Sequence, residues 1–227
     1  MKFAYVLPEP ASYPDWFEFE GDLASMRQAG YDAVELQIAD PCTFDEARVG
    51  QSLRAVGYGL CAFQTGATYV TRGNCLCTTD AVVRRRTTDL VRSFVDLAAR
   101  WNAVMVFGSL QGRLKDEPDR AAGEARIREA IHEVGQYATA RGATVAFEPV
   151  NHSEVGFHNT IAEAAGLVRS LGLPGGQDDG GHFSHEYRGE GHVGASGGNR
   201  RHPCPRPSLG DQPRRAGQRP LGHASVS

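Results

Sequence analysis

The chain has 227 residues, a formal net charge of −3 and five cysteines. A chain of this length can bury a substantial core, as one or two domains or as a single barrel. No stretch approaches the roughly 20 apolar residues that span a bilayer, and the N-terminus lacks the apolar run of a secretory signal. The mild negative charge opposes a general nucleic-acid binder, which carries a basic surface. An odd number of cysteines excludes a complete disulfide framework, so we expect reduced thiols in a cytoplasmic protein.

The composition changes near Pro174. Residues 1–174 carry 22 acidic and 17 basic side chains, whereas residues 175–227 carry 5 and 7. The second segment holds 12 Gly and 5 Pro, only four Leu or Val residues, and no Ile, Met or Trp. Such a segment cannot bury enough apolar surface to offset the entropy of ordering the chain. The composition therefore predicts one ordered domain over 1–174 and a disordered tail over 175–227.

Short apolar segments alternate with helical patterns along the ordered domain. The apolar segments have the length and composition of strands and lie at 3–7, 33–38, 60–63, 103–107 and 144–147. One helical pattern stops near Gly30, and a second starts at the potential cap Asp80. A third stops at Gly142, and a last one runs from a capping box at Thr160 to Gly172.

This order, strand then helix five times over, predicts a parallel sheet covered by helices. No glycine-rich dinucleotide fingerprint follows the first strand, which opposes a Rossmann fold. We therefore predict an α/β fold, an incomplete (β/α)8 TIM barrel of about five βα units. Five units cannot close an eight-stranded barrel, so the first and fifth strands should be unpaired edges.

The ends of the predicted strands carry the candidate functional residues, because TIM barrels place their chemistry there. Gly66 follows the third strand, Gly108 follows the fourth, and Glu148 directly follows the fifth. A carboxylate at the end of a buried strand must be paired, protonated or bound to metal. From position alone, an ion-paired structural Glu148 and a functional one are equally compatible with the sequence.

The segment 145–154, continued by 157–160, resembles the xylose-isomerase-like TIM-barrel family. The resemblance covers about residues 2–174 and is strongest to the sugar (phosphate) isomerase and epimerase branch, which includes ketose 3-epimerases. It implies that Glu148 is both a ligand of a divalent metal and an acid/base carboxylate. The residues that it places at the substrate are Glu154, Asn151, Gly66 and Gly108. For Asn151, a purely structural role in the loop stays open.

The resemblance implies an enzyme that moves a proton α to the carbonyl of a ketose or keto-sugar. The divalent metal, with Mn or Mg favoured over Zn or Co, would stabilise an enediolate. The expected ligand is a small sugar or sugar phosphate, without nucleic acid or membrane, and a homo-oligomer is left open. Two alternatives remain: a non-catalytic truncated remnant or binding protein, and an inosose-type dehydratase on the same barrel.

The tail is compatible with the family's own sequence in another reading frame. Where the family typically continues V-D-T-F-H-M-N-I-E-E, the codons of 178–189, read one base later, can spell M-M-V-D-T-F-H-M-N-I-E-E without a mismatch. The codons of 215–220 can likewise spell A-P-G-N-G-H, another family segment. We therefore predict a one-base frameshift near Gly175 that leaves a metal-binding Asp and His encoded but untranslated, and little or no turnover from the chain as written. A genuine low-complexity extension is the alternative.

Cys75 and Cys77 are the closest pair of cysteines in the chain. One residue separates them, rather than the two residues that separate the cysteines of zinc knuckles and redox pairs. We expect both to be free thiols in a loop.

Overall fold

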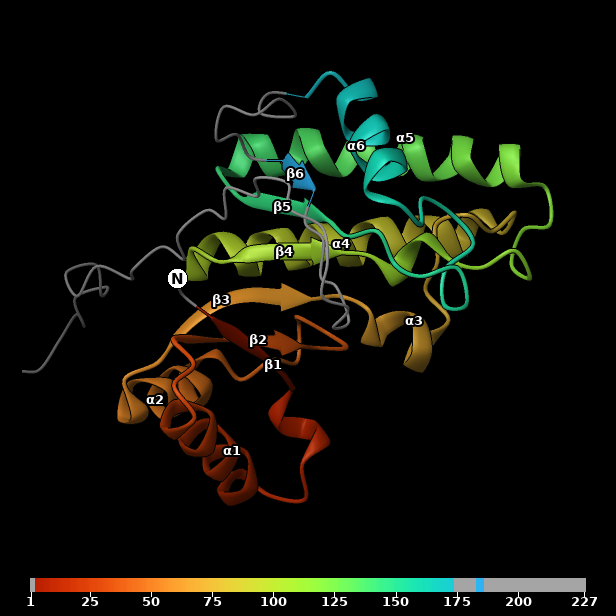
Figure 1. Cartoon of the computed structure of the whole chain (residues 1–227). Helices are drawn as coiled ribbons and strands as arrows, with labels where there is room; N and C mark the ends of the chain where they lie inside the picture. The colour runs from red at the N-terminus through yellow and green to blue at the C-terminus, as the bar shows by residue number, and fades with distance from the viewer. Residues whose placement is uncertain (1–2, 174–182, 186–227) are drawn as a thin grey trace, which may run out of the picture.

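The computed structural model describes residues 3–173 and 183–185. Across these residues, six parallel strands form one sheet in sequential order, each strand pairing with the next. The strands are β1 (Ala4–Pro8), β2 (Ala33–Gln37), β3 (Gly59–Gln64), β4 (Val104–Phe107), β5 (Thr144–Phe147) and β6 (Phe183–His185). Because the strands run in parallel, their carboxyl ends meet at one edge, which Figure 1 shows as the side of the arrowheads.

Helices connect the strands and cover one face of the sheet. They are α1 (Trp16–Gln28), α2 (Glu46–Val56), α3 (Ala67–Arg72), α4 (Ala81–Trp101), α5 (Arg120–Arg141) and α6 (Ile161–Ser170), with 3-10 turns η1 (Pro10–Ser12) and η2 (Ser109–Gln111). Figure 1 shows α1 and α2 beside the first strands and α4 to α6 beside β4 and β5. The predicted caps are present: Asp80 accepts from the amides of Val82 and Val83, and Thr160 forms a complete capping box with Glu163.

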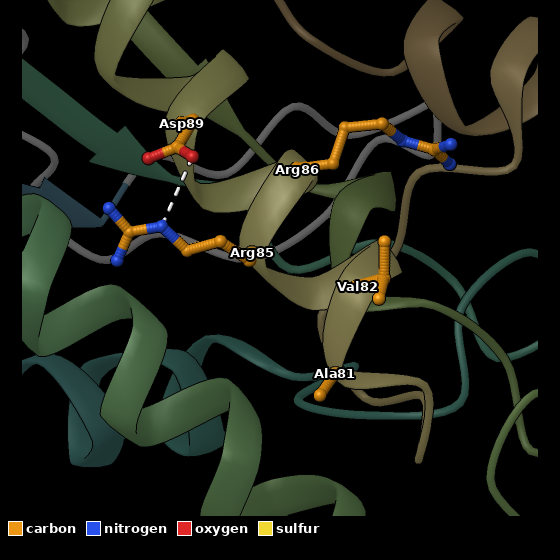
Figure 2. Close-up of a pocket in the computed structure, with 5 residues that line it drawn as sticks. All are labelled: Ala81, Val82, Arg85, Arg86 and Asp89. Carbon is orange, nitrogen blue, oxygen red and sulfur yellow. Dashed lines mark hydrogen bonds and ion pairs between the residues drawn. The ribbon is translucent and has the colours of Figure 1, made fainter.

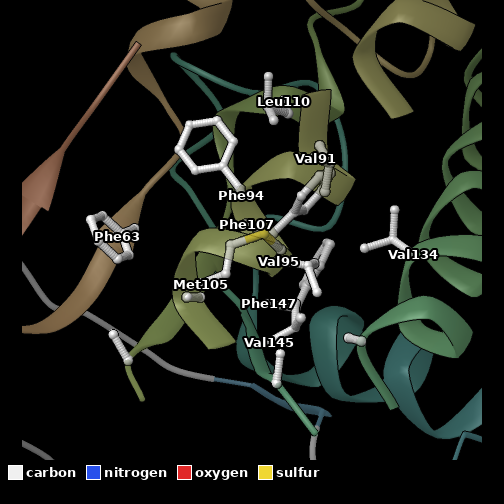
Figure 3. Packing of buried hydrophobic residues seen from close by; sticks show 14 of the residues in the cluster. Phe63, Val91, Phe94, Val95, Met105, Phe107, Leu110, Val134, Val145 and Phe147 are labelled. Carbon is white, nitrogen blue, oxygen red and sulfur yellow. The ribbon is translucent and has the colours of Figure 1, made fainter. Parts of the chain in front are cut away.

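The two faces of the sheet differ in side-chain size. Large apolar side chains point toward the helices and form the main core (Figure 3); from β3, β4 and β5 they include Phe63, Met105, Phe107, Val145 and Phe147. Alternate positions on the same strands hold the small residues Ala62, Val106 and Ala146, which form a separate cluster. In a TIM barrel this second face lines the interior. We refer to it as the inner face.

The five predicted strands and the four predicted helices are confirmed. Two helices were not predicted: α2, and the six-residue α3. The expectation that the fifth strand is an unpaired edge is wrong, because β6 pairs with β5. Strand β6 lies inside the range assigned to a disordered tail. Strand pairing uses backbone groups, so a composition poor in aliphatic residues does not prevent it.

The rest of the predicted tail lies outside the described residues. Among the helices that the structure describes, none has the length and apolar character needed to cross a membrane.

Candidate functional site

Glu148 lies at the carboxyl end of β5 on the inner face. Its amide donates to the carbonyl of Phe107 over 2.8 Å, which extends the β4–β5 ladder by one residue. Side chains alternate between faces along a strand, so Glu148 shares the inner face with Ala146 rather than the helix-covered face with Phe147. The side chain is half-buried. A carboxylate is thus held at the edge where barrel enzymes carry out their chemistry.

Gly108 packs closely against Glu148, and its lack of a side chain leaves space for the Glu148 carboxylate. A Cβ atom at position 108 would lie 3.2 Å from Glu148 Oε2 and 3.0 Å from Val150 Cγ2. Both approaches are tighter than ordinary van der Waals contact, so any side chain here would push on the carboxylate or on the loop behind it. The glycine predicted at the site therefore acts through close packing against Glu148.

Gly66 has a similar role at the end of the neighbouring strand β3. A Cβ atom there would lie 3.3 Å from Ser109 Oγ and 3.4 Å from Gln37 Nε2. The side chains at the ends of β2, β3 and β4 therefore converge at the same edge of the sheet. Gly66, Gly108 and Glu148 therefore lie at the same edge of the sheet, as the positions of the strand ends predict. We refer to this edge, where the strands end, as the rim.

A second acid, Glu35, lies deeper on β2. Only 7% of its surface is exposed, and Gln64 Nε2 donates to its Oε2 over 2.9 Å. This hydrogen bond joins the side chains of β2 and β3. Its burial and this bond support a structural role for Glu35 inside the barrel.

Asn151 and Glu154 lie together in the exposed loop after β5. Asn151 Nδ2 donates to Glu154 Oε1 over 2.5 Å, and the Glu154 amide donates to the Asn151 carbonyl over 3.0 Å. Arg113, from the loop after β4, donates through Nε to the Glu154 carbonyl over 2.8 Å. Asn151 therefore both shapes the turn and orients the carboxylate that the resemblance places at the substrate.

His158 is a residue of this region to which sequence reasoning assigned no role. It is 8% exposed, its Nδ1 lies 2.8 Å from Gln111 Oε1, and its ring meets Phe147 edge-on at 5.8 Å between centroids. Burial lowers the pKa of His158, which favours the neutral imidazole. The side chain therefore connects the loop after β5 to η2. The only signal for it in the sequence was its place inside the segment that carries the family resemblance.

A metal centre around Glu148 is not complete within residues 3–173 and 183–185. Among these residues one group of three metal-ligand side chains clusters, Cys75, Cys77 and Asp116, and Glu148 is not in it. Glu148 can supply one carboxylate ligand. The further ligands that the family resemblance implies belong to later strands, outside the described residues.

A shallow hollow at the start of α4 lies apart from these residues (Figure 2). It is lined by Ala81, Val82, Arg85, Arg86 and Asp89. Arg85 Nε donates to Asp89 Oδ2 over 3.1 Å, and Arg86 Nε donates to Asn74 Oδ1 over 3.0 Å. Both arginines are therefore engaged within the protein, and the lining includes none of the strand-end residues.

Comparison with known proteins agrees with the fold. Residues 23–199 match the family model described as "Xylose isomerase-like TIM barrel". The chain is 28% identical over 163 residues to a ketose 3-epimerase of Arthrobacter globiformis, which covers 70% of this chain and 55% of the relative. It is 27% identical over 158 residues to an L-ribulose 3-epimerase of Mesorhizobium japonicum, with coverages of 68% and 52%. The chain thus spans about half the length of these curated relatives.

Solved structures show the same fold. An L-ribulose 3-epimerase superimposes with a TM-score of 0.65 at 22% identity, over 82% of this chain and 60% of that one. A D-allulose 3-epimerase from Methylomonas sp., in complex with D-allulose, superimposes with a TM-score of 0.61 at 19% identity, over 76% and 60%. At these identities the likeness establishes the architecture alone.

Proposed function

Because this chain belongs to the xylose isomerase-like TIM barrel family, we propose that it derives from a ketose 3-epimerase, in which Glu148 moves the proton on the carbon next to the carbonyl. Sugar epimerases and isomerases are the kind of enzyme to which its relatives belong. The names of the two curated relatives support position C3 of a ketose as the reacting carbon. A cytoplasmic location and a sugar or sugar phosphate as the substrate remain predictions.

The observation that carries this proposal is the placement of Glu148. Its carboxylate lies on the inner face, half-buried, at the carboxyl end of a central strand, with Gly108 clearing the space beside it. A carboxylate placed beside the substrate can remove or return a proton as a general base or acid. The equivalent edge of TIM barrels holds the catalytic groups.

Epimerisation needs a proton removed from one face of the carbon and returned to the other, so two acid/base groups must flank the substrate. Glu148 is one of them. The second would come from a later strand, as the family resemblance implies. This second acid/base group is expected from the untranslated frame, so we expect the chain as written to turn over little or no substrate.

A divalent cation would polarise the substrate carbonyl in the complete barrel. Within the described residues Glu148 belongs to no cluster of three or more metal-ligand side chains, whereas catalytic metal centres typically use three protein ligands. These residues do not fit a complete metal centre. The proposed acid/base role of Glu148 therefore rests on its position on the inner face.

The nucleotide sequence across codons 170–227 is the first test. If reading one base later yields V-D-T-F-H-M-N-I-E-E in an open frame, the corrected gene encodes the missing groups. If the shifted frame lacks this motif, the frameshift is refuted. A non-catalytic protein then becomes the better explanation, since it requires no second carboxylate.

The corrected protein tests the role of Glu148. Incubation with a ketose in deuterated water should place deuterium at C3 and form the epimer. Glu148→Gln should abolish both, whereas Glu129→Gln, an exposed carboxylate on α5, should change neither. Full exchange by Glu148→Gln would refute the assignment, and a dehydrated product would favour the inosose-type dehydratase.

A further inference from the structure

Two thiols and a carboxylate meet between the loop before α4 and the loop after β4. Cys75 Sγ and Cys77 Sγ are 3.9 Å apart. These sulfurs and a carboxylate oxygen of Asp116 all lie within 4.8 Å of one another. The backbone holds the two loops together, because the amides of Leu76 and Cys77 donate to the carbonyls of Leu110 and Gln111 over 2.9 and 3.2 Å.

We propose that Cys75, Cys77 and Asp116 form a binding site for a thiophilic divalent cation such as Zn²⁺, distinct from the site at Glu148. Cysteine thiolates select zinc over the oxygen-preferring Mg²⁺ and Mn²⁺. Three protein ligands leave the fourth tetrahedral position for water.

The spacing of the sulfurs fits tetrahedral coordination. With Zn–S bonds of about 2.3 Å, two thiolates in a tetrahedron lie about 3.8 Å apart, close to the 3.9 Å between Cys75 and Cys77. A disulfide would need the sulfurs about 2.05 Å apart. Both cysteines are free thiols here, as the sequence analysis predicts.

The surroundings orient Asp116 as a ligand. Tyr69 Oη and the amide of Arg113 both donate to Asp116 Oδ2, over 2.7 and 2.9 Å. The other oxygen, Oδ1, has no hydrogen bond within the described residues. Outer hydrogen bonds of this kind commonly fix the carboxylates that bind metals.

Both cysteines are buried, and the space around Cys77 is closely fitted. Cys75 is 4% exposed and Cys77 is fully buried. A Cβ atom on Gly112, whose φ is +95°, would lie 2.5 Å from Cys77 Sγ. Glycine at 112 therefore leaves the space that the sulfur occupies.

A cation here would link the connection between α3 and α4 to the loop after β4. Gly108 and η2 form the start of that loop. A cation bound at Cys75, Cys77 and Asp116 would therefore stabilise the loop that carries Gly108, without touching substrate. A metal site that only the folded chain assembles contributes its binding free energy to folding.

The test uses the full chain with Cys204→Ser, since position 204 lies outside the described residues and could contribute a stray thiolate. The metal-free, reduced protein is titrated with Co²⁺ and then with Zn²⁺. We expect one equivalent of Co²⁺ to produce a thiolate-to-cobalt charge-transfer band that Zn²⁺ removes. Absence of this band in the folded protein would overturn the proposal. This result does not depend on whether the ligand variants described next fold.

Variants assign the ligands. Cys75→Ser and Cys77→Ser should each abolish or strongly diminish the band. Asp116→Asn should weaken Co²⁺ binding at least about tenfold, the loss seen when even an outer partner of a metal ligand is removed. Cys42→Ser, which removes an exposed cysteine, should leave the band unchanged, as should Glu148→Gln. A band that persists in both Cys75→Ser and Cys77→Ser would refute the site.

Discussion

Replacing Phe147 by alanine should remove about 3–5 kcal/mol of stability, the range for large aromatic side chains in a core. Phe147 is fully buried at the end of β5. Its ring stacks on Phe107 at 5.8 Å between centroids and meets the edge of His158 at 5.8 Å. Burying such a side chain contributes about 1.5–3 kcal/mol. An aromatic pair adds about 0.5–1.5 kcal/mol, and the cavity that alanine leaves adds the rest.

The measurement is urea unfolding followed by far-UV circular dichroism, with the free energy of unfolding extrapolated to water. A domain with a typical stability of about 5–15 kcal/mol would lose a large share of it. Phe17→Ala provides the matched control, because Phe17 is 83% exposed and its loss should change stability by less than about 0.5 kcal/mol. If Phe147→Ala costs less than about 1 kcal/mol, then β5 does not pack as described.

Two further predictions concern the rim. Gly108→Ala would place a methyl group 3.2 Å from Glu148 Oε2 and 3.0 Å from Val150 Cγ2, and overpacking of this kind costs about 1–3 kcal/mol; an unchanged urea midpoint would contradict it. Burial lowers the pKa of His158 in the folded protein, so its contribution to stability is complete above the ordinary histidine pKa of about 6.5. This contribution is lost as the pH falls through the folded pKa. His158→Gln should flatten that slope of unfolding free energy against pH, while replacement of the exposed His132 should not.

Local patterns were sufficient to predict most of the sheet and the longer helices. Strands β3 to β5 are short apolar runs, and α4 and α6 begin at residues whose side chains can accept backbone hydrogen bonds. Helix α2 was missed because few large apolar residues, Val49, Leu53 and Val56, mark its buried face. Helix α3, with six residues, is too short for a helical period to show.

The candidate site was predictable where it depended on strand ends. Because parallel strands end at a common edge, the positions of Gly66, Gly108 and Glu148 were enough to expect them on one rim. That both glycines act through close contacts with neighbouring side chains could not be read from the chain. Such contacts depend on how adjacent strands are staggered, and the structure alone supplies that register.

The sequence by itself determined the alternation of strands and helices, the strand-end position of Glu148 and the family resemblance. Each depends on residues close together in the chain. Tertiary structure alone decided that β6 covers the edge of β5 and that Asp116 joins Cys75 and Cys77. Both depend on segments that are far apart in the sequence. Backbone pairing and loop packing bring such segments together, and no local spacing encodes that contact.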